Sequence, residues 1–129
     1  MNLPQECGTG LWIPMVKTSL GSVSLQTTGI QAFHLPAAVP ATAKEVLLFV
    51  DVQIGHSRPR ISSHVKIYTI HNGIHFAKYI SVHSYDQKAW STNSDNIWLP
   101  VFASRTIFVK SPRSHYDSVR CTIDIIGYR

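Results

Sequence analysis

The sequence predicts an all-β protein, namely an antiparallel β-sandwich with a jelly-roll-like arrangement of seven or eight strands. Short stretches that alternate apolar and polar residues recur along the chain, and turn-forming residues separate them. No stretch repeats its apolar residues with the period of an amphipathic helix. The longest apolar run, residues 44–54, is rich in β-branched and aromatic residues, which suit a half-buried pleated surface.

Residues 44–54 are expected to form the central strand of a sheet. Apolar side chains occupy one face at every second position: Val46, Leu48, Val50, Val52 and Ile54. The opposite face is mixed and carries Glu45, Leu47, Phe49, Asp51 and Gln53. A strand with one uniformly apolar face is typical of an antiparallel sheet that packs one side on the core.

The chain before this strand divides into an arm and the beginning of the domain. Residues 1–20 contain two prolines and two glycines without a sustained period, which predicts an irregular N-terminal arm. Residues 21–129 are expected to form a single β-sandwich domain. Within it, residues 22–27 and 30–35 are predicted to be short strands.

A β-hairpin is the clearest local signal in the chain. Residues 64–71 and 74–83 flank Asn72-Gly73, a dipeptide that favours the tightest hairpin turn. The two-residue loop fixes the pairing, with His71 opposite Ile74 and each further pair following in register. One face is mainly apolar and is expected to meet the core. The other face carries His64, Tyr68, His75 and Tyr79, which is unusually aromatic for a surface.

The remaining elements follow the hairpin. Residues 84–96 are polar and predict a loop with a short strand near 89–91. Residues 97–102 predict a strand that Pro100 confines to a sheet edge or a bulge. Residues 105–110 predict another strand. Residues 119–128 close the domain with an apolar face: Val119, Cys121, Ile123 and Ile125.

Charge and composition exclude few partners. Twelve basic and seven acidic residues give a formal net charge of +5, which permits an anionic partner. The basic residues are scattered apart from Arg58-Pro59-Arg60, which speaks against a nucleic-acid partner. No apolar stretch is long enough to span a membrane and no signal peptide is recognisable, so we expect either a cytosolic protein or an excised extracellular module.

The residues that carry chemistry form no recognisable catalytic motif. No serine lies in a nucleophile elbow, no glycine-rich phosphate loop is present, and carboxylates are few. His71 and His75 are expected on opposite faces of the hairpin, which is poor geometry for a shared metal. Cys121 is expected to be a buried thiol, and whether it pairs with Cys7 stays open. We therefore expect no enzyme, no metal and no cofactor.

Residues 83–98 are the predicted ligand site. Aromatic and planar polar side chains, the mixture that recognises sugars, gather there: Tyr85, Asp86, Gln87, Trp90, Asn93, Asp95, Asn96 and Trp98. His56, Arg58 and Arg60 could add donors for an acidic sugar. Trp98 alternates with apolar strand residues and is expected to be a core anchor instead of a ligand contact. For Trp90 both interpretations stay open, and the polar residues could form turns.

An aromatic outer surface predicts an oligomer. Leu47, Phe49, Tyr68 and Tyr79 are expected to form one interface in a homo-oligomer, for example a trimer, unless the N-terminal arm covers them. Two functions follow. The first is an oligomeric, lectin-like module that binds a glycan or another polar ligand with multivalent avidity. The second is a structural domain, as in a capsid, a coat or a fibre tip, whose aromatic face is buried between subunits.

Overall fold

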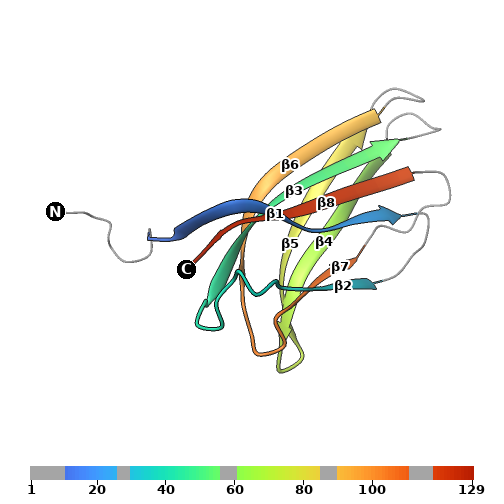
Figure 1. The fold of residues 1–129 in the computed structure, drawn as a ribbon. Coiled ribbons are helices and arrows are strands. Elements are labelled where there is room, and N and C mark those ends of the chain that lie inside the picture. The colour runs from blue at the N-terminus through green and yellow to red at the C-terminus, as the bar shows by residue number, and fades with distance from the viewer. Residues whose placement is uncertain (1–10, 26–29, 56–60, 85–89, 111–117) are drawn as a thin grey trace.

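The computed structural model describes residues 11–25, 30–55, 61–84, 90–110 and 118–129, and it confirms the predicted β-sandwich (Figure 1). The strands are β1 (Ile13–Leu25), β2 (Ile30–His34), β3 (Glu45–Gly55), β4 (Ile61–His71), β5 (Ile74–Ser84), β6 (Trp90–Pro100), β7 (Thr106–Lys110) and β8 (Ser118–Tyr128). They form two four-stranded sheets. Sheet A has the order β1-β8-β3-β6 and sheet B the order β2-β7-β4-β5.

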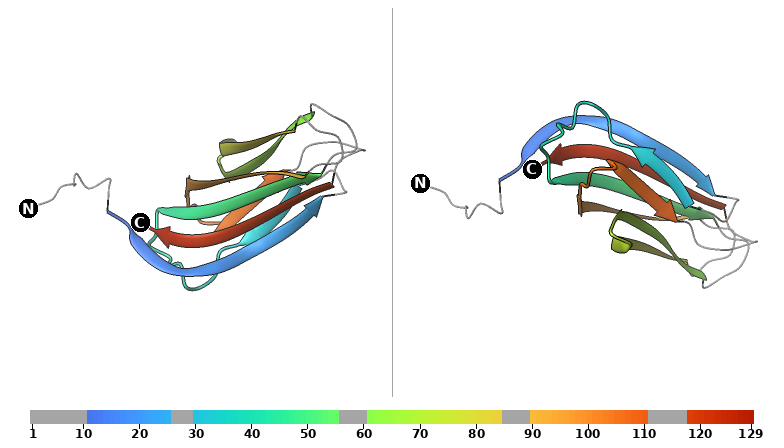
Figure 2. Two further views of the ribbon diagram at one scale, coloured as in Figure 1. Left: turned by 90° about the horizontal axis from the view of Figure 1, so that it is seen from above. Right: turned by 90° about the horizontal axis from the view of Figure 1, so that it is seen from below.

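This strand order is that of a jelly roll. The described chain folds as one antiparallel ribbon, in which β1 pairs with β8, β2 with β7, β3 with β6 and β4 with β5. The ribbon then wraps, so that β3 also pairs with β8 and β4 with β7. The start of β1 and the end of β8 consequently lie side by side, as Figure 2 shows.

The core lies between the two sheets, and β3 is the central strand that the sequence predicts. It pairs with β6 on one side and β8 on the other. Its predicted core face is fully buried at Val46, Leu48, Val50 and Val52. Cys121, Ile123 and Ile125 of β8 pack in the same cluster, as predicted, with Val65 and Ile67 of β4 opposite them. Every second residue of these strands therefore meets the other sheet.

The β4–β5 hairpin has the predicted register. His71 pairs with Ile74, Val65 with Ile80 and Tyr68 with Ala77. Asn72 and Gly73 both have positive φ, of 51° and 76°, as a two-residue turn of this kind requires. The turn therefore determines which side chains face the core and which face outward.

β1 differs from the prediction, because strand structure begins at Ile13 instead of after residue 20. Its pairing with β8 shifts register between Pro14 and Thr18 and again between Ser19 and Gly21. Each bulge breaks the alternation on which a strand prediction relies. β1 lies at the edge of sheet A, where Pro14 is tolerated.

β6 also differs, because residues 90–96 were expected to be mainly loop and belong instead to a continuous strand. Its whole length pairs with β3, from Gly55 opposite Trp90 to Glu45 opposite Pro100. Backbone pairing with β3 does not require apolar side chains, so this polar segment forms a strand. β6 is an edge strand of sheet A, as Pro100 predicts, but it ends at Pro100 and not at residue 102.

Arg105 holds the loop between β2 and β3 through side-chain hydrogen bonds. It has a positive φ of 52°, and its guanidinium donates hydrogen bonds to the carbonyl oxygens of Pro36, Val39 and Pro40 at 3.0, 2.6 and 3.3 Å.

In the described part of the chain no helix is long and apolar enough to cross a bilayer.

Candidate functional site

The predicted ligand residues lie only partly within the described residues. Tyr85, Asp86 and Gln87, and likewise His56, Arg58 and Arg60, fall outside them. Trp90 is the first residue of β6. The contribution of these residues to a site stays a prediction.

Asn93, Asp95 and Asn96 are exposed on β6, but they do not share one face. Asn93 and Asp95 stand on the side of the buried Leu99, whereas Asn96 stands on the outer side of sheet A. The Asn93 amide donates a hydrogen bond to the backbone oxygen of Ser81 in β5, at 2.8 Å. Asn93 therefore links the edges of the two sheets.

Trp98 lies on the outer face of sheet A and is not a core anchor. Its ring meets that of Trp12 edge to face, with centroids 6.0 Å apart. The Arg129 guanidinium lies 4.1 Å from the Trp98 centroid and donates a hydrogen bond to Glu45 Oε1 at 2.6 Å. Trp12 also packs directly on Gly127, where a side chain would overlap its ring. The Trp12 side chain thus covers part of the outer face of sheet A.

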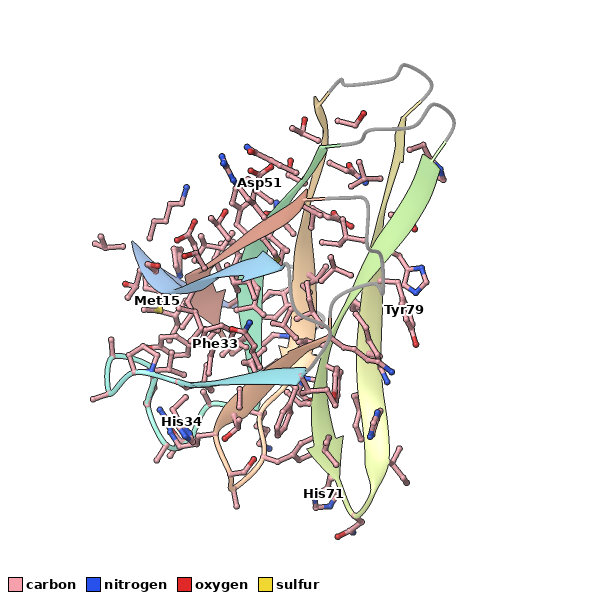
Figure 3. The ribbon with its side chains drawn as sticks, turned by 90° about the vertical axis from the view of Figure 1, so that its right-hand side faces the viewer. Met15, Phe33, His34, Asp51, His71 and Tyr79 are labelled. Atoms are coloured by element: carbon pink, nitrogen blue, oxygen red, sulfur yellow. The ribbon has the colours of Figure 1, made fainter. Side chains whose placement is uncertain are left out.

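The four residues of the predicted oligomer interface do not form one surface. Leu47 and Phe49 belong to the outer face of sheet A, and Tyr68 and Tyr79 to the outer face of sheet B. Leu47 and Tyr68 are already buried within one copy, whereas Tyr79 is 59% exposed. Figure 3 shows Tyr79 pointing away from the sandwich, on the side opposite to Asp51 of β3.

The outer face of sheet B carries a row of three parallel rings across three strands. Phe108 of β7, Tyr68 of β4 and His75 of β5 form what we call the aromatic row. The Tyr68 ring stacks on His75 at 4.7 Å and on Phe108 at 5.4 Å, with interplanar angles of 15° and 22°. Pairing of Tyr68 with Phe108 across β4 and β7 brings about this arrangement.

Polar groups flank the aromatic row. Lys66 Nζ lies 4.4 Å from the Tyr68 centroid and 2.8 Å from His75 Nδ1. Because an ammonium group only donates, His75 Nδ1 accepts this hydrogen bond and its proton resides on Nε2. Next to them, the rings of His64 and Tyr79 meet edge to face at 5.5 Å. Burial raises the pKa of the Tyr68 phenol, which therefore keeps its proton.

The two sheets differ in charge. Glu45, Asp51, Asp95 and Asp124 are the acidic residues in the described part of the chain, and all belong to strands of sheet A. The strands of sheet B contain no acidic residue. They carry Lys66, Lys78 and Lys110 and the histidines His34, His64, His71, His75 and His83. Of the basic residues that look scattered in the sequence, Lys66, Lys78 and Lys110 thus belong to sheet B, whereas Lys17 and Arg120 belong to sheet A.

The described residues offer neither a metal site nor a reactive cysteine. They contain no group of three histidine, cysteine or acidic side chains that could hold a metal ion. Cys121 is a buried free thiol, as expected, and burial together with the nearby Asp51 raises its pKa to about 12. It is therefore no candidate nucleophile, and the outer face of sheet B is the candidate site.

Comparison with known proteins adds no relative. The chain matches no protein-family model, and a search of curated proteins found no match.

Proposed function

We propose that this protein is a recognition module that binds a glycan, and that the outer face of sheet B is its binding surface. The observation that carries the proposal is the aromatic row with its flanking donors. Tyr68 is buried and holds the row rigidly in the sheet, while the exposed rings of His75 and Tyr79 form the surface that a ligand can reach. Lys66, His64 and Tyr79 stand beside it with polar groups.

This combination suits a sugar. A pyranose ring presents C–H groups on its faces, which pack on aromatic rings, and hydroxyl groups at its rim, which need hydrogen-bond partners. Tyr79 offers both, because its exposed side chain has an apolar ring and a hydroxyl group. The sequence singled out Tyr68 and Tyr79 as interface residues. Their neighbours Phe108 and Lys66 could be recognised as part of a site only once the strand order was known.

A glycan array with the Tyr79→Ala variant tests the proposal. We expect Tyr79→Ala to weaken binding at least tenfold, because it removes an exposed aromatic contact. Phe76→Ala is the matched control, since Phe76 is a 40% exposed aromatic residue of the same strand on its opposite face. Glycan binding that Tyr79→Ala leaves intact but Trp90→Ala or Asp86→Ala abolishes would place the site at residues 83–98 instead.

An assembly domain is the second candidate, and the start of β1 favours it. Ile13 and Val16 of β1 are 54% and 87% exposed at the edge of sheet A, and Leu11, just before β1, is 68% exposed. An apolar edge strand is a natural place for a second copy of the chain to pack. We expect a homo-oligomer in solution, whose mass by light scattering falls to that of one chain in Val16→Asp. A wild-type protein that stays monomeric at high concentration would contradict this candidate.

A further inference from the structure

The outer face of sheet B concentrates positive charge without a counterion among the described residues. Lys66 of β4 and Lys110 of β7 are direct register partners, so two ammonium groups project from the same face. Like charges at such a pair destabilise a sheet. His75 adds a third basic group beside Lys66. An anion placed between these groups would remove the repulsion.

His75 belongs to the same group of polar side chains. Its Nδ1 accepts a hydrogen bond from Lys66, and its ring stacks on Tyr68. The strands of sheet B contain no carboxylate, so none of their side chains neutralises Lys66 or Lys110. A ligand anion could accept hydrogen bonds from both ammonium groups.

We propose that the ligand of sheet B is an anionic glycan, whose sulfate or carboxylate groups lie across Lys66, His75 and Lys110. This inference rests on the proposed function. The sugar rings would pack on the exposed rings of His75 and Tyr79, and the acidic groups would meet Lys66 and Lys110 beside them. Nucleic acid fits less well, because the strands of sheet B contain no arginine and a phosphate backbone requires many cations.

The test uses a sulfated oligosaccharide and its unsulfated parent, with affinity measured by calorimetry. We expect the sulfated compound to bind about tenfold more tightly than its parent, the effect of one added charge-assisted contact. Lys66→Gln should remove most of this gain. Lys78→Gln is the matched control, because Lys78 projects from the opposite face of β5.

Each of the other outcomes contradicts a specific part of the two proposals. Equal affinity for the sulfated compound and its unsulfated parent would contradict the anionic ligand and leave glycan binding intact. Binding of neither sugar would end both proposals. Tighter binding of a single-stranded oligonucleotide, lost in Lys66→Gln, would identify a nucleic-acid face instead. A sulfated sugar that binds with the same affinity to Lys66→Gln and to Lys78→Gln would remove the assignment to sheet B.

Discussion

Thr69 has a buried hydroxyl group for which the described residues offer no hydrogen-bond partner. Its side chain is buried on the core side of β4, and its hydroxyl has no hydrogen-bond partner among the described residues. Burying a hydroxyl in this way costs free energy that no contact returns. The position accepts threonine because its shape matches that of valine.

We therefore predict that Thr69→Val raises the free energy of unfolding by about 1 kcal/mol, since it removes an unsatisfied group and keeps the volume. Denaturant unfolding measures the change. Thr106→Val is the control, because the buried Thr106 hydroxyl donates to the backbone oxygen of Ser104 at 2.9 Å. That variant should lose stability, and a loss of stability in Thr69→Val would show that its hydroxyl has a partner.

Cys121 provides a prediction about pH. Burial and the charge of Asp51 raise its pKa from 9.0 to about 12, so the folded protein holds the thiol proton more tightly than the unfolded chain does. Its contribution to stability is complete below pH 9.0 and is lost as the pH rises toward about 12.

In a Cys7→Ser background, we expect a thiol reagent at pH 9.0 to label Cys121 only at the rate of unfolding. Adding denaturant should make labelling fast. Rapid labelling of the native protein would mean that Cys121 is accessible and that its pKa is not raised.

At the scale of elements, the strands that alternate strictly could be predicted from the sequence. β3, the β4–β5 hairpin and the core face of β8 follow from alternation and from the Asn72-Gly73 turn. The start of β1 could not be predicted, because two bulges break its period. The polar half of β6 could not either, because its strand structure comes from pairing with β3. Local sequence does not contain information about a partner strand.

The contact between β1 and the end of β8 is open to a direct test. Gly127 lies under the Trp12 ring, so the methyl group of Gly127→Ala would displace Trp12 from sheet A. We predict a loss of about 1–3 kcal/mol in the free energy of unfolding, as for other overpacked sites, with a changed near-ultraviolet circular dichroism signal.

A double-mutant cycle separates this contact from a general effect of alanine. In a Trp12→Ala background, Gly127→Ala should cost less, because the overlapping ring is gone and only the Ile13 backbone oxygen, 2.9 Å from the new methyl group, still opposes it. The same cost in both backgrounds would mean that the backbone contact, and not Trp12, sets the cost.

At the scale of the whole molecule, strand order determines which residues become neighbours. The sequence indicates an aromatic face on the hairpin, but Phe108 joins it only because β7 pairs with β4. The same order assigns the described acidic residues to sheet A and leaves sheet B basic. Scattered charge in a sequence can therefore become a charged face in a jelly roll. The predicted site at residues 83–98 rests on local density alone and stays a prediction.

The most direct test of the binding face is a titration of the isotope-labelled protein with the sulfated oligosaccharide, followed by backbone amide chemical shifts. We expect the shift changes to concentrate on β4, β5 and β7 around Tyr68, while the amide shifts of β1, β3 and β8 in sheet A stay unchanged. Shifts confined to sheet A, or to β6 and the residues before it, would contradict the assignment of the binding surface to sheet B.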